Sequence, residues 1–190
     1  MGRTAVSLSV ALAALLAAGS ASAAVSVLGE GPAAQCSSAA MAGDAKDEDI
    51  SACNLALLQA SGVHEQAGTY VNRGVLLLRR KQFAAARADF EAAEKLAPTM
   101  GEAVVNRGAS FIAERRYLEG LTEIDRGLAL GPEEPEKAYY NRALANEGLD
   151  DMKAAYLDYM KALELAPNWE APRHELQRFT VENPKKSGWK

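Results

Sequence analysis

Residues 67–100, AGTYVNRGVLLLRRKQFAAARADFEAAEKLAPTM, decide the fold because their pattern returns further along the chain. An Asn-Arg pair followed by a small residue begins at Asn72, Asn106 and Asn141, at intervals of 34 and 35 residues. A proline follows each of these asparagines after 26 residues. Two stretches in each unit are apolar at helical spacing, and the proline ends the second. A period of this length indicates a stacked array of helical hairpins.

Residue size repeats with the same period. Small residues recur at positions 8, 20 and 27 of each unit, where they let two helices approach, and mostly large ones recur at positions 4, 11 and 24. With Ala67 as position 1, the first unit has Tyr70, Gly74, Leu77, Ala86, Phe90, Ala93 and Pro98 at positions 4, 8, 11, 20, 24, 27 and 32. This pattern resembles the tetratricopeptide repeat family. The departures are Val104 at position 4, Asn146 at position 11 and an arginine at position 7 of every unit.

The resemblance implies an all-α fold, a right-handed superhelical stack of antiparallel helical hairpins. Because a terminal repeat exposes an apolar face, a C-terminal capping helix is expected to cover it, with Glu175 and Arg178 on its outer side. The predicted boundaries are 1–23 for a signal peptide, 24–66 for an N-terminal segment with a degenerate disulfide-stapled hairpin, 67–100, 101–135 and 136–169 for three repeats, 170–182 for the capping helix and 183–190 for a flexible tail.

The first 23 residues have the pattern of a secretory signal peptide. Arg3 precedes an apolar stretch from Ala5 to Ala18, which is too short to span a bilayer comfortably. Ala21-Ser22-Ala23 supplies the small residues that signal peptidase reads, so cleavage is predicted after Ala23. The protein is therefore expected in the periplasm or outside the cell, as an exported bacterial chain with no membrane span after cleavage. The alternative is an uncleaved N-terminal anchor.

The two cysteines, Cys36 and Cys53, are expected to be oxidised in an exported protein. If a fourth, degenerate repeat begins at Glu30, Cys36 takes position 7 and Cys53 position 24, which face each other across the hairpin in the resembled family. A disulfide closing a loop of roughly 17 residues is worth about 3 kcal/mol on the chain-entropy model. The alternative is a pair of free thiols.

An arginine at position 7 and an acidic residue at position 23 occur in all three repeats. These positions face each other in the resembled family, and a guanidinium can bind a carboxylate through two hydrogen bonds. The predicted structural ion pairs are Arg73–Asp89, Arg107–Glu123 and Arg142–Asp158. The alternative is a row of arginines that clamps an anionic ligand.

In the resembled family the first helix of each repeat lines a concave groove. The partner-binding surface this implies is Val71, Asn72, Val75, Leu78 and Arg79 from the first repeat, Glu102, Val105, Asn106, Ala109 and Ile112 from the second, and Lys137, Tyr140, Asn141, Leu144 and Glu147 from the third. An amide side chain both donates and accepts, so the three asparagines can bond a peptide backbone. The alternative is that they tie neighbouring repeats together.

No residue pattern in the chain predicts catalysis. His64 and His174 lie in different elements, with no cysteine or acid at a recognised metal-ligand spacing. We therefore expect no enzyme activity, no cofactor and no metal. The net charge of −4 also argues against nucleic acid, which needs a clustered basic surface.

The sequence therefore predicts a periplasmic interaction module or scaffold that binds a peptide or a partner helix in its groove. One alternative is a structural, self-assembling protein whose groove is filled by another copy. A second is an accessory subunit of an envelope enzyme. The oligomeric state and the identity of the partner stay open.

Overall fold

The computed structural model describes residues 7–10, 21–26, 31–43 and 45–182. Most of the predicted signal peptide and the predicted tail at 183–190 lie outside the described residues. The elements are β1 Ser7–Val10, α1 Pro32–Ala42, α2 Asp47–Gln59, α3 Val63–Arg79, α4 Phe83–Leu96, α5 Gly101–Ala113, α6 Tyr117–Ala129, α7 Pro135–Gly148, α8 Met152–Leu165, α9 Glu170–Leu176 and β2 Phe179–Glu182.

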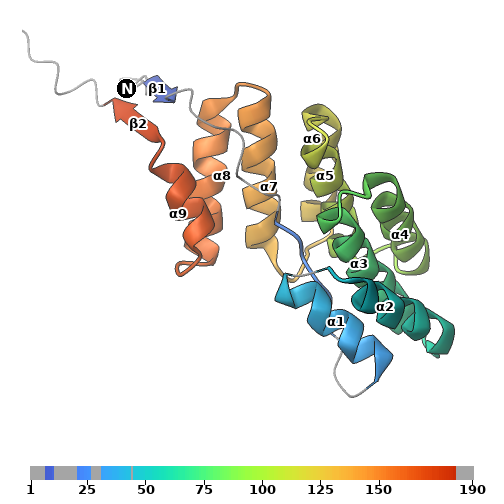
Figure 1. The fold of residues 1–190 in the computed structure, drawn as a ribbon. Helices are drawn as coiled ribbons and strands as arrows, with labels where there is room; N and C mark the ends of the chain where they lie inside the picture. Colours follow the sequence, from blue (N-terminus) through green and yellow to red (C-terminus); the bar gives the residue numbers. More distant parts are fainter. Residues whose placement is uncertain (1–6, 11–20, 27–30, 44, 183–190) are drawn as a thin grey trace, which may run out of the picture.

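Consecutive helices pair into hairpins that stack in chain order. The hairpins are α1 with α2, α3 with α4, α5 with α6, and α7 with α8. Within the three repeats, each first helix also contacts the first helix of the next repeat, α3 with α5 and α5 with α7 (Figure 1). The expected all-α fold of stacked hairpins is confirmed. The described residues add one two-stranded pairing between β1 and β2.

Glycines allow the two helices of a hairpin to approach closely. A Cβ atom built on Gly74 would lie 2.4 Å from Cε1 of Phe90, whose side chain is fully buried in the facing helix. In the next repeat, a Cβ on Gly108 would lie 2.8 Å from Cδ1 of Ile124. Since ordinary carbon contacts are about 3.5–4.0 Å, these positions have no room for a side chain. The small residues of the repeat thus set the helix spacing.

The turns inside the hairpins of the three repeats use the same backbone conformation. Lys81, Arg115 and Asp150 have φ values of 59°, 62° and 63°, in the left-handed region. All three occupy position 15 of their repeats, so the repeat extends to the turn geometry. Helix α3 starts at Val63 and so extends beyond the predicted start of the first repeat at Ala67.

The C-terminal end differs from the single capping helix predicted over 170–182. Helix α9 ends at Leu176, and Phe179–Glu182 forms strand β2, antiparallel to β1. Phe179, Thr180 and Val181 are aromatic and β-branched residues, which favour a strand over a helix. Phe179 packs against Tyr156 and Tyr159 of α8, with ring centroids 5.7 and 6.0 Å apart. The end of the stack is therefore covered by a short helix and a strand.

Candidate functional site

Residues 21–26, which we call the groove segment, lie across the first helices of the three repeats. Figure 1 shows this segment in blue, running from beside α7 toward α1. Asn106 of α5 accepts a hydrogen bond from the Ala23 N–H at 3.0 Å and donates one to the Ala23 carbonyl at 2.7 Å. The side-chain amide of Asn106 thus pairs with both the N–H and the carbonyl of Ala23, as the backbone of a neighbouring β-strand would.

The other two asparagines of the repeats bind the groove segment in the same way. Asn72 of α3 exchanges two hydrogen bonds of 2.8 Å with the backbone of Val25. Asn141 of α7 accepts from the Ala21 N–H at 2.8 Å and donates to the Ala21 carbonyl at 2.6 Å. The segment therefore advances two residues per repeat and runs opposite to the order of the repeats. We call Asn72, Asn106 and Asn141 the asparagine row.

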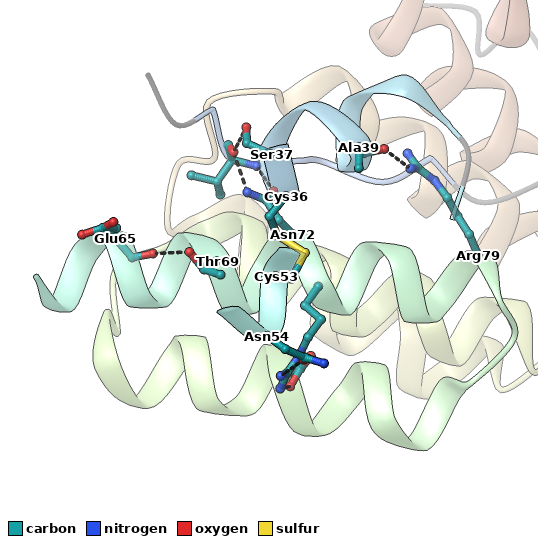
Figure 2. Close-up of a disulfide and its surroundings, with 12 residues drawn as sticks. Cys36, Ser37, Ala39, Cys53, Asn54, Glu65, Thr69, Asn72 and Arg79 are labelled. Atoms are coloured by element: carbon teal, nitrogen blue, oxygen red, sulfur yellow. Dashed lines mark hydrogen bonds and ion pairs between the residues drawn. A yellow bond between two sulfur atoms is a disulfide. The ribbon is translucent and has the colours of Figure 1, made fainter. Parts of the chain in front are cut away.

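Val25 is held from more than one side. Its carbonyl also accepts a hydrogen bond from Ser37 Oγ of α1 at 2.9 Å. Its Cγ1 atom lies 3.0 Å from where a Cβ of Gly68 would stand, so a side chain larger than glycine would press on Val25. Figure 2 shows that Ser37 and Asn72 lie close to the disulfide. Helix α1 thus closes one end of the groove.

Alternate residues of the groove segment line a cavity. Ser22, Ala24 and Ser26 contribute to a cavity of about 430 Å³. Its other walls come from α1, from the first helices and from the loop before α7, through Ala40, Met41, Arg79, Glu102, Glu133, Glu134 and Lys137. Odd-numbered residues of the segment therefore bind the asparagine row, and even-numbered residues border a space with charged walls.

The predicted groove residues fall into groups. The asparagine row binds the segment, and Arg79, Glu102 and Lys137 line the cavity. Apolar members of the predicted set are buried in the stack, and some of them pack in the cluster that Ala24 and Val25 contact. These buried apolar members are Val71, Val75, Leu78, Val105, Ala109, Ile112, Tyr140 and Leu144.

Two residues that the sequence predicts to line the groove, both at position 5 of their repeats, are buried inside their own hairpins instead. Val105 Cγ2 lies 2.6 Å from where a Cβ of Gly127 in α6 would stand. Tyr140 contacts Tyr159 of α8 and Trp169, with ring centroids 5.5 and 5.0 Å apart. Their side chains are only 1% and 3% exposed, because they fill the interior of their own hairpins.

Glu147, also predicted to line the groove, instead anchors the C-terminal end. It accepts hydrogen bonds from Tyr159 Oη at 2.6 Å and from Arg178 Nη2 at 2.6 and 2.7 Å. Arg178 also forms an ion pair with the buried Glu175 at 2.7 Å, so the prediction that both face outward is wrong. Burial and the Glu147 carboxylate raise the pKa of the Tyr159 hydroxyl, which stays a protonated donor. The carboxylate thus ties α8 to the chain after α9.

The arginines at position 7 bind the acids at position 23. Arg73 contacts Asp89 through two hydrogen bonds of 2.8 and 2.7 Å. Arg142 contacts Asp158 through two bonds of 2.9 and 2.7 Å, and the carboxylate raises the pKa of this guanidinium. Arg107 donates to one oxygen of Glu123 at 3.2 and 2.7 Å. All three ion pairs that the sequence predicts are therefore present in the structure.

Each arginine also reaches the preceding hairpin, which the sequence analysis missed. The Nη1 atom of Arg107 donates to Glu94 of α4 at 2.8 Å, and that of Arg142 donates to Asp125 of α6 at 2.9 Å. Glu94 also accepts from Arg126, and this hydrogen bond lowers the pKa of its carboxyl group. The guanidinium row links neighbouring hairpins, so its donors are engaged within the stack and not in an anion clamp.

The first hairpin carries the disulfide. Cys36 of α1 and Cys53 of α2 are bonded, and both sulfur-bearing side chains are fully buried against Leu76 of α3 (Figure 2). Arg73 Nη1 donates to Asn54 of α2 at 2.7 Å. Because small residues dominate this hairpin, the covalent bond and these contacts position α1, which supplies Ser37 to the groove segment.

A family model described as "Tetratricopeptide repeat" matches residues 67–100 and 136–168. These two stretches are therefore tetratricopeptide repeats. The similar solved structures each cover about three fifths of this chain or more. The Arabidopsis OM64 TPR domain is 24% identical, with a TM-score of 0.56 over 62% of this chain and 96% of that one. No curated protein matches the chain in sequence.

Two further solved structures are similar to this chain. The first TPR of Spaghetti (RPAP3), bound to the HSP90 peptide SRMEEVD, is 22% identical, with a TM-score of 0.55 over 61% of this chain and 94% of that one. MamA from Desulfovibrio magneticus RS-1 is 22% identical, with a TM-score of 0.55 over 73% and 77% of the chains. At this identity the likeness establishes the fold alone.

Among the described residues, no group of histidines, cysteines and acids is arranged to hold a metal ion. No helix in the same part of the chain is long and apolar enough to cross a membrane. The sequence analysis missed the groove segment as a binding partner of the asparagine row. The clue available was spacing, because Ala21, Ala23 and Val25 alternate at the two-residue period of a strand.

Proposed function

We propose that this protein is an exported interaction module that binds an extended segment of a partner protein across α3, α5 and α7. The observation that carries the proposal is the asparagine row, which binds both backbone groups of Ala21, Ala23 and Val25. Main-chain hydrogen bonds of this kind are the basis of strand-like peptide recognition. The groove is therefore built to receive a polypeptide in extended form.

The groove as described favours small side chains at alternate positions of its ligand. Ala23 is 1% exposed, and Gly68 leaves only enough space for Val25. A solved structure of similar fold holds the HSP90 peptide SRMEEVD, which supports peptide binding as a use of this fold. That peptide is acidic, whereas the cavity here is lined by Glu102, Glu133 and Glu134 as well as by Arg79 and Lys137, so acidic groups outnumber basic ones. We therefore propose a ligand that is neutral and rich in small residues.

The signal-peptide pattern supports a location outside the cytoplasm, in the periplasm or beyond the cell. The Cys36–Cys53 disulfide fits such a compartment, because disulfides persist in oxidising surroundings. We propose a scaffold role, because the groove contacts are made to a polypeptide backbone.

The test is photo-crosslinking with a peptide of residues 19–27, GSASAAVSV, that carries a diazirine amino acid in place of Val25. With the intact chain at high peptide concentration, the crosslink should map to α3 beside Gly68, where Val25 lies. The control is the Asn72→Ala chain, which should lose this crosslink while the helical content of the protein is unchanged. Crosslinks to the second helices α4, α6 or α8 would show that peptides bind elsewhere, and the proposal would fail.

A further inference from the structure

The proposed signal-peptidase cut lies inside the groove segment. Hydrolysis of the Ala23–Ala24 bond by water would leave a carboxylate on Ala23 and an ammonium group on Ala24. Ala21 and Ala23, bound to Asn141 and Asn106, stand before the cut, and Val25, bound to Asn72, stands after it. The bond that is cut therefore joins residues 21–23, which bind the second and third repeats, to residues 24–26, which bind the first repeat.

The part after the cut has contacts of its own. Val25 keeps two hydrogen bonds with Asn72 and one with Ser37, and it contacts Gly68. The new ammonium group would form at Ala24, which borders the cavity with Glu102. A carboxylate there stabilises a positive charge that is sheltered from water. The new N-terminus is thus held at the first repeat.

When the residues before the cut dissociate, the side chains of Asn106 and Asn141 become available to another ligand. Asn106 and Asn141 are fully buried while Ala23 and Ala21 are present. Without these residues, both amide groups lose their two backbone partners, and the surface beside them is free for another extended segment. Water can satisfy the amides, but the apolar floor that Ala21 covers beside the second and third repeats becomes exposed.

We infer that residues 21–23 fill the groove of the uncut chain and that cleavage after Ala23 opens Asn106 and Asn141 to an extended partner segment with small side chains. This inference rests on the proposed function, and it adds that a partner binds at Asn106 and Asn141 once the chain is cut after Ala23. An outside peptide must compete with a segment on the same chain, whose effective concentration is in the millimolar range. If the tethered segment has an intrinsic affinity of about 0.1 mM and an effective concentration of about 1 mM, it should weaken the binding of an outside peptide about tenfold.

The experiment compares the intact chain with the same chain cut after Ala23 by signal peptidase. The probe is an amidated peptide with the sequence of residues 17–23, AAGSASA, and the readout is the side-chain amide NMR signals of the asparagine row. In the cut chain, the signals of Asn106 and Asn141 should shift on titration, and that of Asn72 should not. In the intact chain the same shifts should need about ten times more peptide.

The Ala23→Pro substitution tests the same point without cleavage. Proline lacks the N–H that Asn106 accepts, so the uncut variant should bind the probe more tightly than the wild type. Ala24→Pro is the matched control, because the Ala24 N–H has no hydrogen bond within the described residues, and it should bind like the wild type.

The outcomes separate the inference from the proposed function. If the cut and intact chains bind the probe equally, or if Ala23→Pro binds no better than Ala24→Pro, the inference is overturned and the proposed function stands. If no form of the chain binds the probe at Asn106 or Asn141, the proposed function fails as well. A cut chain that forms dimers through these two asparagines would replace the outside partner by a second copy and overturn the inference.

Discussion

Replacing Asn106 by alanine should detach the groove segment without unfolding the stack. The side chain makes two hydrogen bonds to Ala23, at 3.0 and 2.7 Å, and both residues are buried. At about 0.5–1.5 kcal/mol for each bond, docking of the segment should weaken by about 1–3 kcal/mol. That change corresponds to about 5- to 150-fold in the docking equilibrium. The unfolding free energy of the helices should change by less than the docking free energy, because these two hydrogen bonds of Asn106 join it to the segment.

Native-state hydrogen exchange measures this effect at the Ala21 N–H, whose own acceptor, Asn141, is unchanged by the substitution. Its protection should fall by the same factor, because local opening controls the exchange of such amides. Asn146→Ala is the matched control: Asn146 donates to Asp158 at 3.0 Å inside the last hairpin, so its loss should lower stability and spare Ala21. Unchanged Ala21 protection in Asn106→Ala, together with a large loss of stability, would mean that Asn106 ties the repeats together, and our reasoning would be refuted.

Three further predictions concern the stack. In a double-mutant cycle of Arg107→Met and Glu123→Gln, urea unfolding should give a coupling energy of about 1–2 kcal/mol, since the pair is partly buried, whereas additive effects would exclude a structural pair. Gly74→Ala should lower the unfolding free energy by about 1–2 kcal/mol, because overpacking outweighs the gain in helix propensity, and a more stable variant would contradict this. The hydrogen bond from Arg126 lowers the pKa of Glu94 in the folded state, so its stabilisation is present above the ordinary value of 4.5 and is lost as the pH falls through the folded pKa. Glu94→Gln should therefore lose less stability than the wild type on acidification below about pH 4.5, and equal acid profiles would contradict the shift.

The fold can be predicted from the sequence because the residues that specify it lie close together in the chain and recur in every repeat. A glycine, alanine or larger residue at a fixed position of each unit specifies how closely two adjacent helices pack, and Gly74 opposite Phe90 is an example. The same regularity placed one asparagine per repeat on successive first helices. It also paired Arg73 with Asp89 across a separation of 16 residues, within one hairpin. Interactions of this kind lie inside the repeat and can be predicted from it.

The contacts that decide the site join distant parts of the chain. The groove segment meets the asparagine row at separations of 47, 83 and 120 residues. These bonds use the backbone of Ala21, Ala23 and Val25, and backbone groups are the same in every residue type, so they leave no mark on the side-chain pattern. The place of the side chains at position 5 was wrongly predicted for a related reason. The rotation of the first helix in the stack decides whether Val105 or Tyr140 points to the groove or to the second helix of its hairpin.

By itself, the sequence determined the number, length and pairing of the repeated hairpins and the placement of one asparagine on each first helix, because these depend on short-range periodicity. Only the tertiary structure decided what those asparagines bind, how Glu147 holds the C-terminal end and where β1 meets β2. Each of these depends on how the assembled stack brings together segments that are far apart in the sequence, and no local pattern encodes those contacts.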